Sequence, residues 1–343
     1  MADAKSNGSP TMNDVAKEAR VSVATVSRVI NGSGSVSEKL ENRVKRAMKK
    51  LHYHPSILAR SFKMQETRQI GLLIPLLDHP FFSRLTQATE QALFSQDYRA
   101  IICNTEENHM REQEYVELLL RQRVDGMIIN SATNVVDYMA DLQARNIPCV
   151  LIDRNVPEFS CSKVFSDNSR GGYIGMKYLL DLGHTNVVVV APFSFGEPTQ
   201  LRLQGIRKAL TERGIQETPN MFIETDDYSF DLGVHIGQQI AVMNPRPTAV
   251  FALTDVTAVG ILRAFLQANI SVPRDISVMG YDGIPLASYV TPSISTVAQP
   301  IEEMGKEAVS SLLNHIQNPD LPPDLITLKT KLIIRESTAE PPH

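Results

Sequence analysis

The 343-residue chain lacks tryptophan, has only three cysteines and contains no long apolar run. No apolar stretch approaches the roughly 18–20 residues that span a bilayer. Residues 1–10, MADAKSNGSP, are polar and lack the apolar core of a secretory signal, so we expect a disordered leader on a cytoplasmic protein. Cys103, Cys149 and Cys161 are widely spaced, without a CxxC pair. We expect the thiols in the apolar segments IIC and CVLI to be buried and inert, in a reducing compartment.

Charge is balanced overall but not along the chain. The 34 Lys and Arg and 38 Asp and Glu give a net charge of -4, which by itself argues against a nucleic-acid-binding protein. Residues 1–69, however, hold 13 basic and 6 acidic residues, and the remainder holds 21 and 32. The resulting net charges of +7 and -11 predict a basic head on an acidic body.

Helical patterns fill the basic head. Thr11, Ser22 and Ser37 are residues that favour helix N-caps, and each precedes apolar residues at helical spacing. The second helix is predicted from Val23 to Ile30 and ends at Asn-Gly. Two short helices joined by about three or four residues, with a third to close the core, predict a helix-turn-helix domain over residues 11–54.

The second predicted helix has a face suited to the DNA major groove. Small residues at its start permit deep entry, and Arg28, one turn later, can pair with guanine O6 and N7. Hydroxyl groups near the helix start suit phosphate oxygens. A three-helix bundle without a DNA role is the alternative. The candidate DNA-contacting residues of this region are Ser22, Val23, Ala24, Thr25, Ser27, Arg28 and Asn31.

The stretch VSVATVSRVIN, with VSEKLENRVKRAMKKLHYHPSILARSFK after it, resembles the head of the LacI/GalR family of bacterial transcriptional repressors. The similarity continues to about Ser337. It implies that two heads read a palindromic operator as a dimer, through positions matching Val23, Ala24 and Arg28. The C-terminus, RESTAEPPH, lacks the apolar heptads of a tetramerising tail, so we expect a homodimer.

Residues 55–68 resemble the hinge helix and linker of that family, which implies a helix that folds on the operator. Such a short segment is only marginally helical alone, so its folding can depend on DNA. Ala59 and Phe62 are the DNA-contacting candidates, with Phe62 at the position that wedges into the minor groove. Many relatives have Leu at this position, and the alternative is that Phe62 packs on the body.

The acidic body, residues 69–343, alternates short apolar runs with amphipathic helices. This alternation predicts doubly wound parallel sheets, and the length favours two lobes. The fold class is therefore an all-α head joined by a hinge to an α/β body. The resemblance implies the periplasmic-binding-protein fold. We expect lobe one to contain about 69–159 and 291–322, and lobe two about 160–290 and 323–343. The predicted strands are IGLLIPLL, RAIICN, DGMIIN, CVLID, NVVVVAP, AVFAL and ISVMGYD.

No motif in the body supports an enzyme, although doubly wound sheets often form enzymes. GxGxxG, GxxxxGK[ST], GxSxG and HExxH are all absent. The eight histidines show no metal-ligand spacing. We therefore expect neither catalysis nor a cofactor.

Polar and aromatic residues follow several predicted strands, where α/β sheets bind ligands. Carboxylates and an Arg suit hydroxyl-rich ligands, and aromatic faces cover sugars or bases. The resemblance implies that an effector cleft is lined by Phe81, Phe82, Asp153, Arg202, Tyr228, Asp255 and Asp282. Alternatively, Phe81 and Phe82 are core residues, Asp255 is a helix N-cap, and Asp282 caps a turn. The loop Phe193–Thr199 and Thr254 depart from the commoner family pattern, which leaves a sugar and a nucleoside or purine open.

These observations predict a dimeric repressor controlled by a small metabolite. One alternative keeps the DNA-binding head but places control with a protein partner. A solute-binding protein for uptake would share the body but would carry a secretory signal and no head. No membrane partner is expected.

Overall fold

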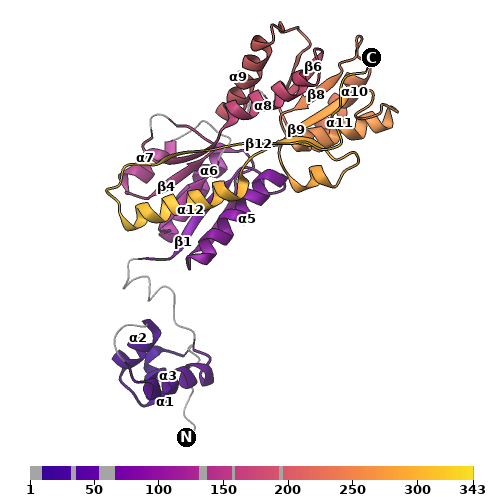
Figure 1. The fold of residues 1–343 in the computed structure, drawn as a ribbon. Helices are drawn as coiled ribbons and strands as arrows, with labels where there is room; N and C mark the ends of the chain where they lie inside the picture. The colour runs from indigo at the N-terminus through magenta and orange to yellow at the C-terminus, as the bar shows by residue number, and fades with distance from the viewer. Residues whose placement is uncertain are drawn as a thin grey trace. The chain divides into compact units, whose positions relative to one another are not determined.

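The structure, a computed structural model, describes residues 10–31, 36–53, 66–130, 137–156, 159–192 and 196–342. The chain divides into two units, Met1–Thr67 and Arg68–His343, which are drawn in Figure 1 and are called the head and the body here. Most of the predicted hinge, including Ala59 and Phe62, lies outside the described residues.

The head contains the three predicted helices: α1 (Met12–Ala19), α2 (Val23–Asn31) and α3 (Glu38–Lys50). Thr11 and Asp14 form a capping box, in which each side chain accepts a hydrogen bond from the other residue's backbone N–H, so both amides are satisfied at the start of α1. Ser37 occupies the N-cap position of α3, but its side chain makes no capping hydrogen bond.

A small apolar core joins the three helices. Arg43 of α3 donates hydrogen bonds to the carbonyl oxygens of Ala19 and Arg20, at 2.5 and 3.1 Å, and so satisfies carbonyls at the end of α1. The fully or nearly fully buried residues of this core are Val15, Ala16, Ala19, Val26, Val44 and Ala47.

The body contains two six-stranded sheets, as the apolar runs predict (Figure 1). Among the strands of the described residues, all pairings are parallel except the one between β10 and β12. The first sheet has the order β11 (Leu325–Leu328), β5 (Ser162–Ser166), β4 (Cys149–Ile152), β3 (Gly126–Ile129), β1 (Gln69–Ile74), β2 (Arg99–Asn104). The second has the order β12 (Lys331–Ile333), β10 (Ser295–Ala298), β9 (Ser277–Asp282), β8 (Ala249–Ala252), β6 (Val187–Pro192), β7 (Phe222–Thr225). All seven predicted strands are present, and the predicted fold class is confirmed.

Helices flank both sheets. Those associated with the first sheet are α5 (Pro80–Ser95), α6 (His109–Gln122), α7 (Asp137–Ala144) and α12 (Ile301–Gln317). Those associated with the second are α8 (Asn168–Asp181), α9 (Gly196–Glu212), α10 (Phe230–Ala241) and α11 (Asp255–Gln267), with the short 3₁₀ helix η1 (Pro285–Ser288). Figure 1 shows α5 and α12, which are in contact, side by side. No helix in the described part of the chain is long and apolar enough to cross a membrane.

Three strands lie in the other lobe from the one that we expected. β5 and β11 belong to the first sheet, although the expected boundaries place their residues in lobe two, and β10 belongs to the second sheet, although those boundaries place it in lobe one. The reason is that the chain crosses between lobes after β5, after β10 and after β11, each time at the end of a strand. We call these the three crossovers.

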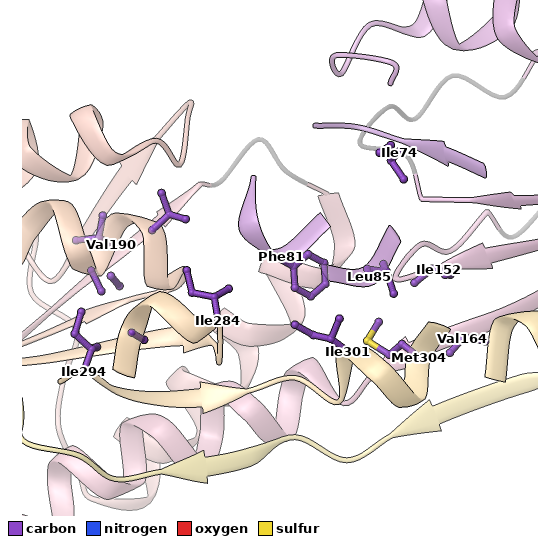
Figure 2. Close-up of a cluster of buried hydrophobic side chains, with 14 of the residues drawn as sticks. Ile74, Phe81, Leu85, Ile152, Val164, Val190, Ile284, Ile294, Ile301 and Met304 are labelled. Carbon is purple, nitrogen blue, oxygen red and sulfur yellow. The ribbon is translucent and has the colours of Figure 1, made fainter. Parts of the chain in front are cut away.

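One apolar cluster includes residues of both lobes. Ile74 and Leu85 come from the first lobe, and Val190 and Ile284 come from the second. Figure 2 shows Phe81, the first aromatic residue of α5, among the buried side chains of this cluster. Phe81 is therefore a core residue, as one of the alternatives predicts. It also lines the cavity between the lobes, so it can contact a ligand as well.

Candidate functional site

In the head, α2 presents one face to the core and another to solvent. Val26 is fully buried, whereas Val23, Ala24 and Arg28 are exposed. The Arg28 side chain is therefore accessible to a base edge, and its DNA contact stays a prediction.

The hydroxyl groups at the start of α2 already satisfy the helix end. Ser22 Oγ accepts a hydrogen bond from Thr25 N at 3.1 Å and lies 2.9 Å from Thr25 Oγ1. Ser27 is half-buried, and Asn31 is the last residue of α2. Of the three hydroxyl-bearing candidates Ser22, Thr25 and Ser27, only Ser22 is exposed, and its contact with phosphate stays a prediction.

In the body, a cavity of about 120 Å³ lies between the lobes, at the carboxyl ends of the strands of both sheets. This position agrees with the rule for ligand sites in α/β sheets. Six of the seven predicted effector residues line it: Phe81, Phe82, Asp153, Arg202, Tyr228 and Asp282. The other lining residues are Pro75, His79, Asn130, Arg154, Asn155, Pro192, Gly196, Glu197, Pro198, Thr199, Thr254 and Gln299.

Arg202 organises one wall of the cavity. Its guanidinium lies 3.9 Å from the centre of the Tyr281 ring, donates from Nε to Asn168 Oδ1 at 2.8 Å, and donates from Nη1 to the Leu253 carbonyl at 2.9 Å. Nη1 lies 3.8 Å from Asp282 Oδ1. These contacts fix the plane of a buried cation, which is the arrangement that recognises oxygen atoms of a ligand in fixed directions.

Close packing of two helices places Arg202. Gly172 of α8 lies so close to α9 that an added Cβ would be 1.9 Å from the Arg202 carbonyl oxygen, and Gly205 of α9 is equally close to the Ser169 carbonyl oxygen of α8. Glycine at both positions therefore permits the helix approach that brings Arg202 to the cavity.

Asp282 ends β9 with a φ of 108°, in the left-handed region, and Gly283 follows with a φ of 78°. Its Oδ1 accepts a hydrogen bond from Gln299 Nε2 at 2.7 Å. Burial raises the pKa of Asp282 to about 6, and the nearby Arg202 charge limits the rise. A carboxylate of this kind is ionised near pH 7 and retains lone pairs for a ligand.

Asp153 faces the cavity from the first lobe, directly after β4, and also has a left-handed backbone, with a φ of 51°. Its Oδ1 accepts hydrogen bonds from Ser166 N at 3.2 Å and Asn168 Nδ2 at 3.1 Å. Burial raises its pKa, and the Arg202 charge opposes the rise. Asn168, which follows the first crossover, thus bonds to Asp153 of one lobe and Arg202 of the other.

Aromatic rings also line the cavity. The Phe81 and Phe82 ring centres are 5.2 Å apart, with an edge-to-face orientation. His79 lies 5.2 Å from Phe82 and 4.9 Å, edge-on, from Tyr228 of the second lobe. The Tyr228 hydroxyl donates to Glu107 Oε1 of the first lobe, so Tyr228 offers the cavity its ring and links the lobes. Burial raises the pKa of both partners of this bond.

Several buried polar atoms that lack partners converge on this cavity. Within the described residues, five buried side-chain nitrogen or oxygen atoms have no hydrogen-bond partner, and four of them belong to cavity-lining residues: His79 Nδ1 and Nε2, Asn130 Nδ2 and Gln299 Oε1. Burial lowers the pKa of His79 to about 4, so its ring is neutral near pH 7 and has one donor and one acceptor. Unpaired buried polar groups are costly, so their clustering points to a polar ligand.

Asp255 does not line the cavity. It is fully buried at the start of α11, where Oδ2 accepts from Gly283 N and Ile284 N, both at 2.8 Å, and Oδ1 accepts from Thr296 Oγ1 at 2.6 Å. Nor is Asp255 the helix N-cap, because Thr254 has that role. Burial and the neighbouring Asp282 charge raise its pKa to about 8. Asp255 therefore holds the turn after Asp282.

Most of the neutral polar lining is not among the predicted site residues. Asn130 follows β3, Gln299 follows β10 and His79 follows β1 by a few residues, so the available signal was a polar residue after an apolar strand. Arg154 adjoins the predicted Asp153 and is buried. For Gln299 that signal required recognition of β10, which was not predicted.

Comparison with known proteins agrees with this architecture. Residues 11–56 match the model of bacterial regulatory proteins of the lacI family, and residues 176–338 match that of the periplasmic binding protein-like domain. The ribose operon repressor of Haemophilus influenzae is 37% identical over 328 residues, which cover 95% of this chain and 98% of that protein. The transcriptional repressor PurR of Photobacterium profundum is 34% identical, and the aligned residues cover 96% of this chain and 99% of that protein.

Solved structures are similar as well. The lac repressor dimer bound to operator has a TM-score of 0.86 at 29% identity, covering 97% of this chain and 100% of that one. A LacI family transcriptional regulator from Enterococcus faecium with bound ribose has a TM-score of 0.73 at 33% identity, covering 79% and 99%.

A helix-turn-helix head and a two-lobed body with a polar cavity define the class: a transcriptional repressor with a small-molecule effector. The chain belongs to the lacI family of bacterial regulatory proteins. It is a regulator and not an enzyme.

Proposed function

We propose that the effector is a single-ring, hydroxyl-rich sugar, with D-ribose as the best fit. The observation that carries this proposal is the convergence of unpartnered His79, Asn130 and Gln299 atoms on the cavity that also holds Asp282 and Arg202. Each sugar hydroxyl both donates and accepts a hydrogen bond, so a ring with several hydroxyls can satisfy neutral, anionic and cationic groups together. The aromatic side covers the apolar face of the same ring.

The volume of the cavity supports a ligand with a single ring. The cavity volume of about 120 Å³ is well below the roughly 300–1,000 Å³ of sites for drug-sized molecules. A nucleoside, with a base attached to its sugar, needs more room. Ribose operon repressors are 37–38% identical to this chain, PurR proteins are 33–34% identical, and regulators solved with bound ribose are 31–33% identical.

For DNA, we propose that a homodimer in the cytoplasm reads a palindromic operator. Two copies of the exposed α2 face, with Arg28 as the main base-reading residue and Val23 and Ala24 beside it, would occupy successive major grooves. The contacts predicted for residues 55–68, including Ala59 and Phe62, complete the interface. The operator-bound lac repressor dimer, which is similar over almost the whole chain, supports this assembly.

Effector control requires unequal binding to two arrangements of the lobes. A coupling free energy of about 1–3 kcal/mol changes operator affinity roughly 5–150-fold. The Tyr228–Glu107 bond and the Asp153–Asn168–Arg202 chain both join the lobes at the cavity. A ligand that replaces or reinforces these bonds therefore shifts the balance between arrangements.

Calorimetry on the full-length chain tests the ligand. D-ribose, other pentoses, hexoses, hypoxanthine, guanine and adenosine should be titrated separately, with Asp282→Asn as the matched variant. We expect ribose to bind most tightly and the variant to bind it at least 10-fold more weakly. Preferential binding of a purine would contradict the sugar assignment, and no binding by any compound would favour control by a protein partner. Selection of bound DNA from a random pool, with and without ribose, would identify the operator and the direction of the response.

A further inference from the structure

Cys149 and Cys161 are neighbours across two adjacent strands. Cys149 is the first residue of β4, Cys161 directly precedes β5, and the parallel register pairs the next residues, Val150 and Ser162. Neighbouring strands lie about 4.8 Å apart, which is within the roughly 4.4–6.8 Å between Cα atoms that a disulfide spans. Both side chains pack in the same apolar cluster, on one face of the sheet.

The two thiols are chemically unequal. Interaction with the neighbouring Cys149 thiol lowers the pKa of Cys161, burial opposes this shift, and the Lys163 charge and the Leu151 backbone N–H lower the pKa further. The same interaction, together with burial, raises the pKa of Cys149. Cys161 is half-buried and Cys149 is buried. A partly accessible, low-pKa thiol beside a second thiol is the usual arrangement of a redox-sensing pair.

Cys103 provides the contrast within the chain. It is buried in β2, and burial raises its pKa to about 11. The expectation that buried thiols are inert therefore suits Cys103, whereas for Cys149 the strand register supplies a partner that the sequence alone does not reveal.

We propose that hydroperoxides oxidise Cys149 and Cys161 to a reversible disulfide, and that this disulfide weakens effector binding. The Cys161 thiolate attacks a peroxide oxygen: an S–O bond forms, the O–O bond breaks, and the leaving hydroxide takes a proton to give water when hydrogen peroxide is the oxidant. The Cys149 thiol then attacks the sulfenic sulfur; the S–S bond forms, the S–O bond breaks, and a second water leaves with the Cys149 proton. Two thiols are oxidised by two electrons and one peroxide is reduced.

The pair lies at the base of the segment that carries Asp153 and Arg154 into the cavity. Lys163, two residues after Cys161, donates to Asn155 Oδ1 and to the Val156 carbonyl, both at 3.0 Å, so movement near Cys161 reaches this segment. A disulfide requires the sulfurs to close to about 2.05 Å. This effect rests on the proposed function, and we expect about 10-fold weaker ribose binding, in the lower part of the usual range for allosteric coupling.

The experiment treats full-length protein with hydrogen peroxide, blocks remaining thiols and counts them by mass spectrometry before and after reduction. We expect two thiols per chain to be lost in wild type and in the control Cys103→Ser, and to return with dithiothreitol. Cys149→Ser should instead accumulate a sulfenic acid at Cys161 that dimedone traps. Retention of all three thiols, or a crosslink that includes Cys103, would contradict the proposed disulfide between Cys149 and Cys161.

Calorimetry with ribose on oxidised and reduced protein then tests the coupling. Equal affinities, with the disulfide verified by mass, would overturn the effect on the effector. If the reduced protein bound no ribose, the proposed effector would be wrong, while the thiol count would still decide the disulfide.

Discussion

Protonation of Asp282 should weaken effector binding as the pH falls. The carboxylate is buried, which raises its pKa to about 6, and its Oδ1 already accepts a hydrogen bond from Gln299. When ionised, it can accept further hydrogen bonds from sugar hydroxyls and complements the Arg202 charge, 3.8 Å away. When protonated, it loses both the charge and an acceptor position, so the affinity should fall below about pH 6.

The magnitude follows from the ionised fraction. With a pKa of about 6, roughly nine-tenths of Asp282 is ionised at pH 7 and about one-eleventh at pH 5. If the ionised form alone binds, the dissociation constant rises about 10-fold between pH 7 and pH 5, which corresponds to about 1.4 kcal/mol. Further acidification should weaken binding by up to about 10-fold per pH unit for one linked proton.

Calorimetry with ribose between pH 5 and pH 8, on wild type and Asp282→Asn, measures this dependence. His79 titrates near pH 4 and Asp255 near pH 8, and burial also raises the pKa of Asp153, so the variant is needed to separate the Asp282 contribution between pH 5 and pH 7. The variant keeps the side-chain shape and should bind weakly, with a much smaller change in affinity between pH 5 and pH 7 than wild type. A flat wild-type profile, or the same slope in the variant, would refute the reasoning. Operator binding without ligand serves as the folding control.

Three further predictions concern the head, the unit boundary and helix packing. Arg28→Ala should weaken binding to a guanine-containing operator by about 1–3 kcal/mol and leave non-specific binding nearly unchanged, as measured by competition gel shift. Removal of residues 1–67 should abolish DNA binding and preserve ribose binding by calorimetry, because the body is a separate unit. Gly172→Ala should lower the free energy of unfolding in urea by at least about 1–3 kcal/mol, because its Cβ would overlap the Arg202 carbonyl oxygen.

Each of these has an opposing outcome. Equal loss of affinity on all DNA sequences would make Arg28 a phosphate contact and not a base-reading residue. DNA binding by residues 68–343 would contradict the role of the head. Wild-type stability of Gly172→Ala would show that α8 and α9 separate at little cost.

Local features of the fold could be predicted from the sequence because they depend on near neighbours. Thr11 and Asp14 form a capping box within one turn, and Val23 begins a helix because Ser22 satisfies its end. Six of the seven predicted strands are buried and parallel, and they are continuous apolar runs, which is how such strands appear in sequence; the seventh, β2, is an apolar edge strand that is only partly buried. The short strands β5, β10, β11 and β12 have weaker patterns, which do not predict them.

Features that depend on pairing between distant segments could not be predicted. The place of Ser162–Ser166 in the first sheet depends on its pairing with Cys149–Ile152 and Leu325–Leu328, which the local apolar pattern does not reveal. The position of Asp255 is a similar case: a carboxylate after a strand predicts a cleft residue, whereas its three hydrogen bonds hold it to Thr296 and to the turn after Asp282. The proximity of Cys149 to Cys161 likewise depends on the strand register.

The hydrogen bonds of Asn168 connect the first crossover between the lobes with the residues that line the cavity. Asn168 follows the first crossover and bonds to Asp153 and Arg202, while Gln299, which follows the second, bonds to Asp282. A substitution of any of these groups changes the mechanics of lobe movement together with ligand contact. Changes in sugar preference among related repressors should therefore accumulate at lining positions without such bonds, of which His79 is the clearest here.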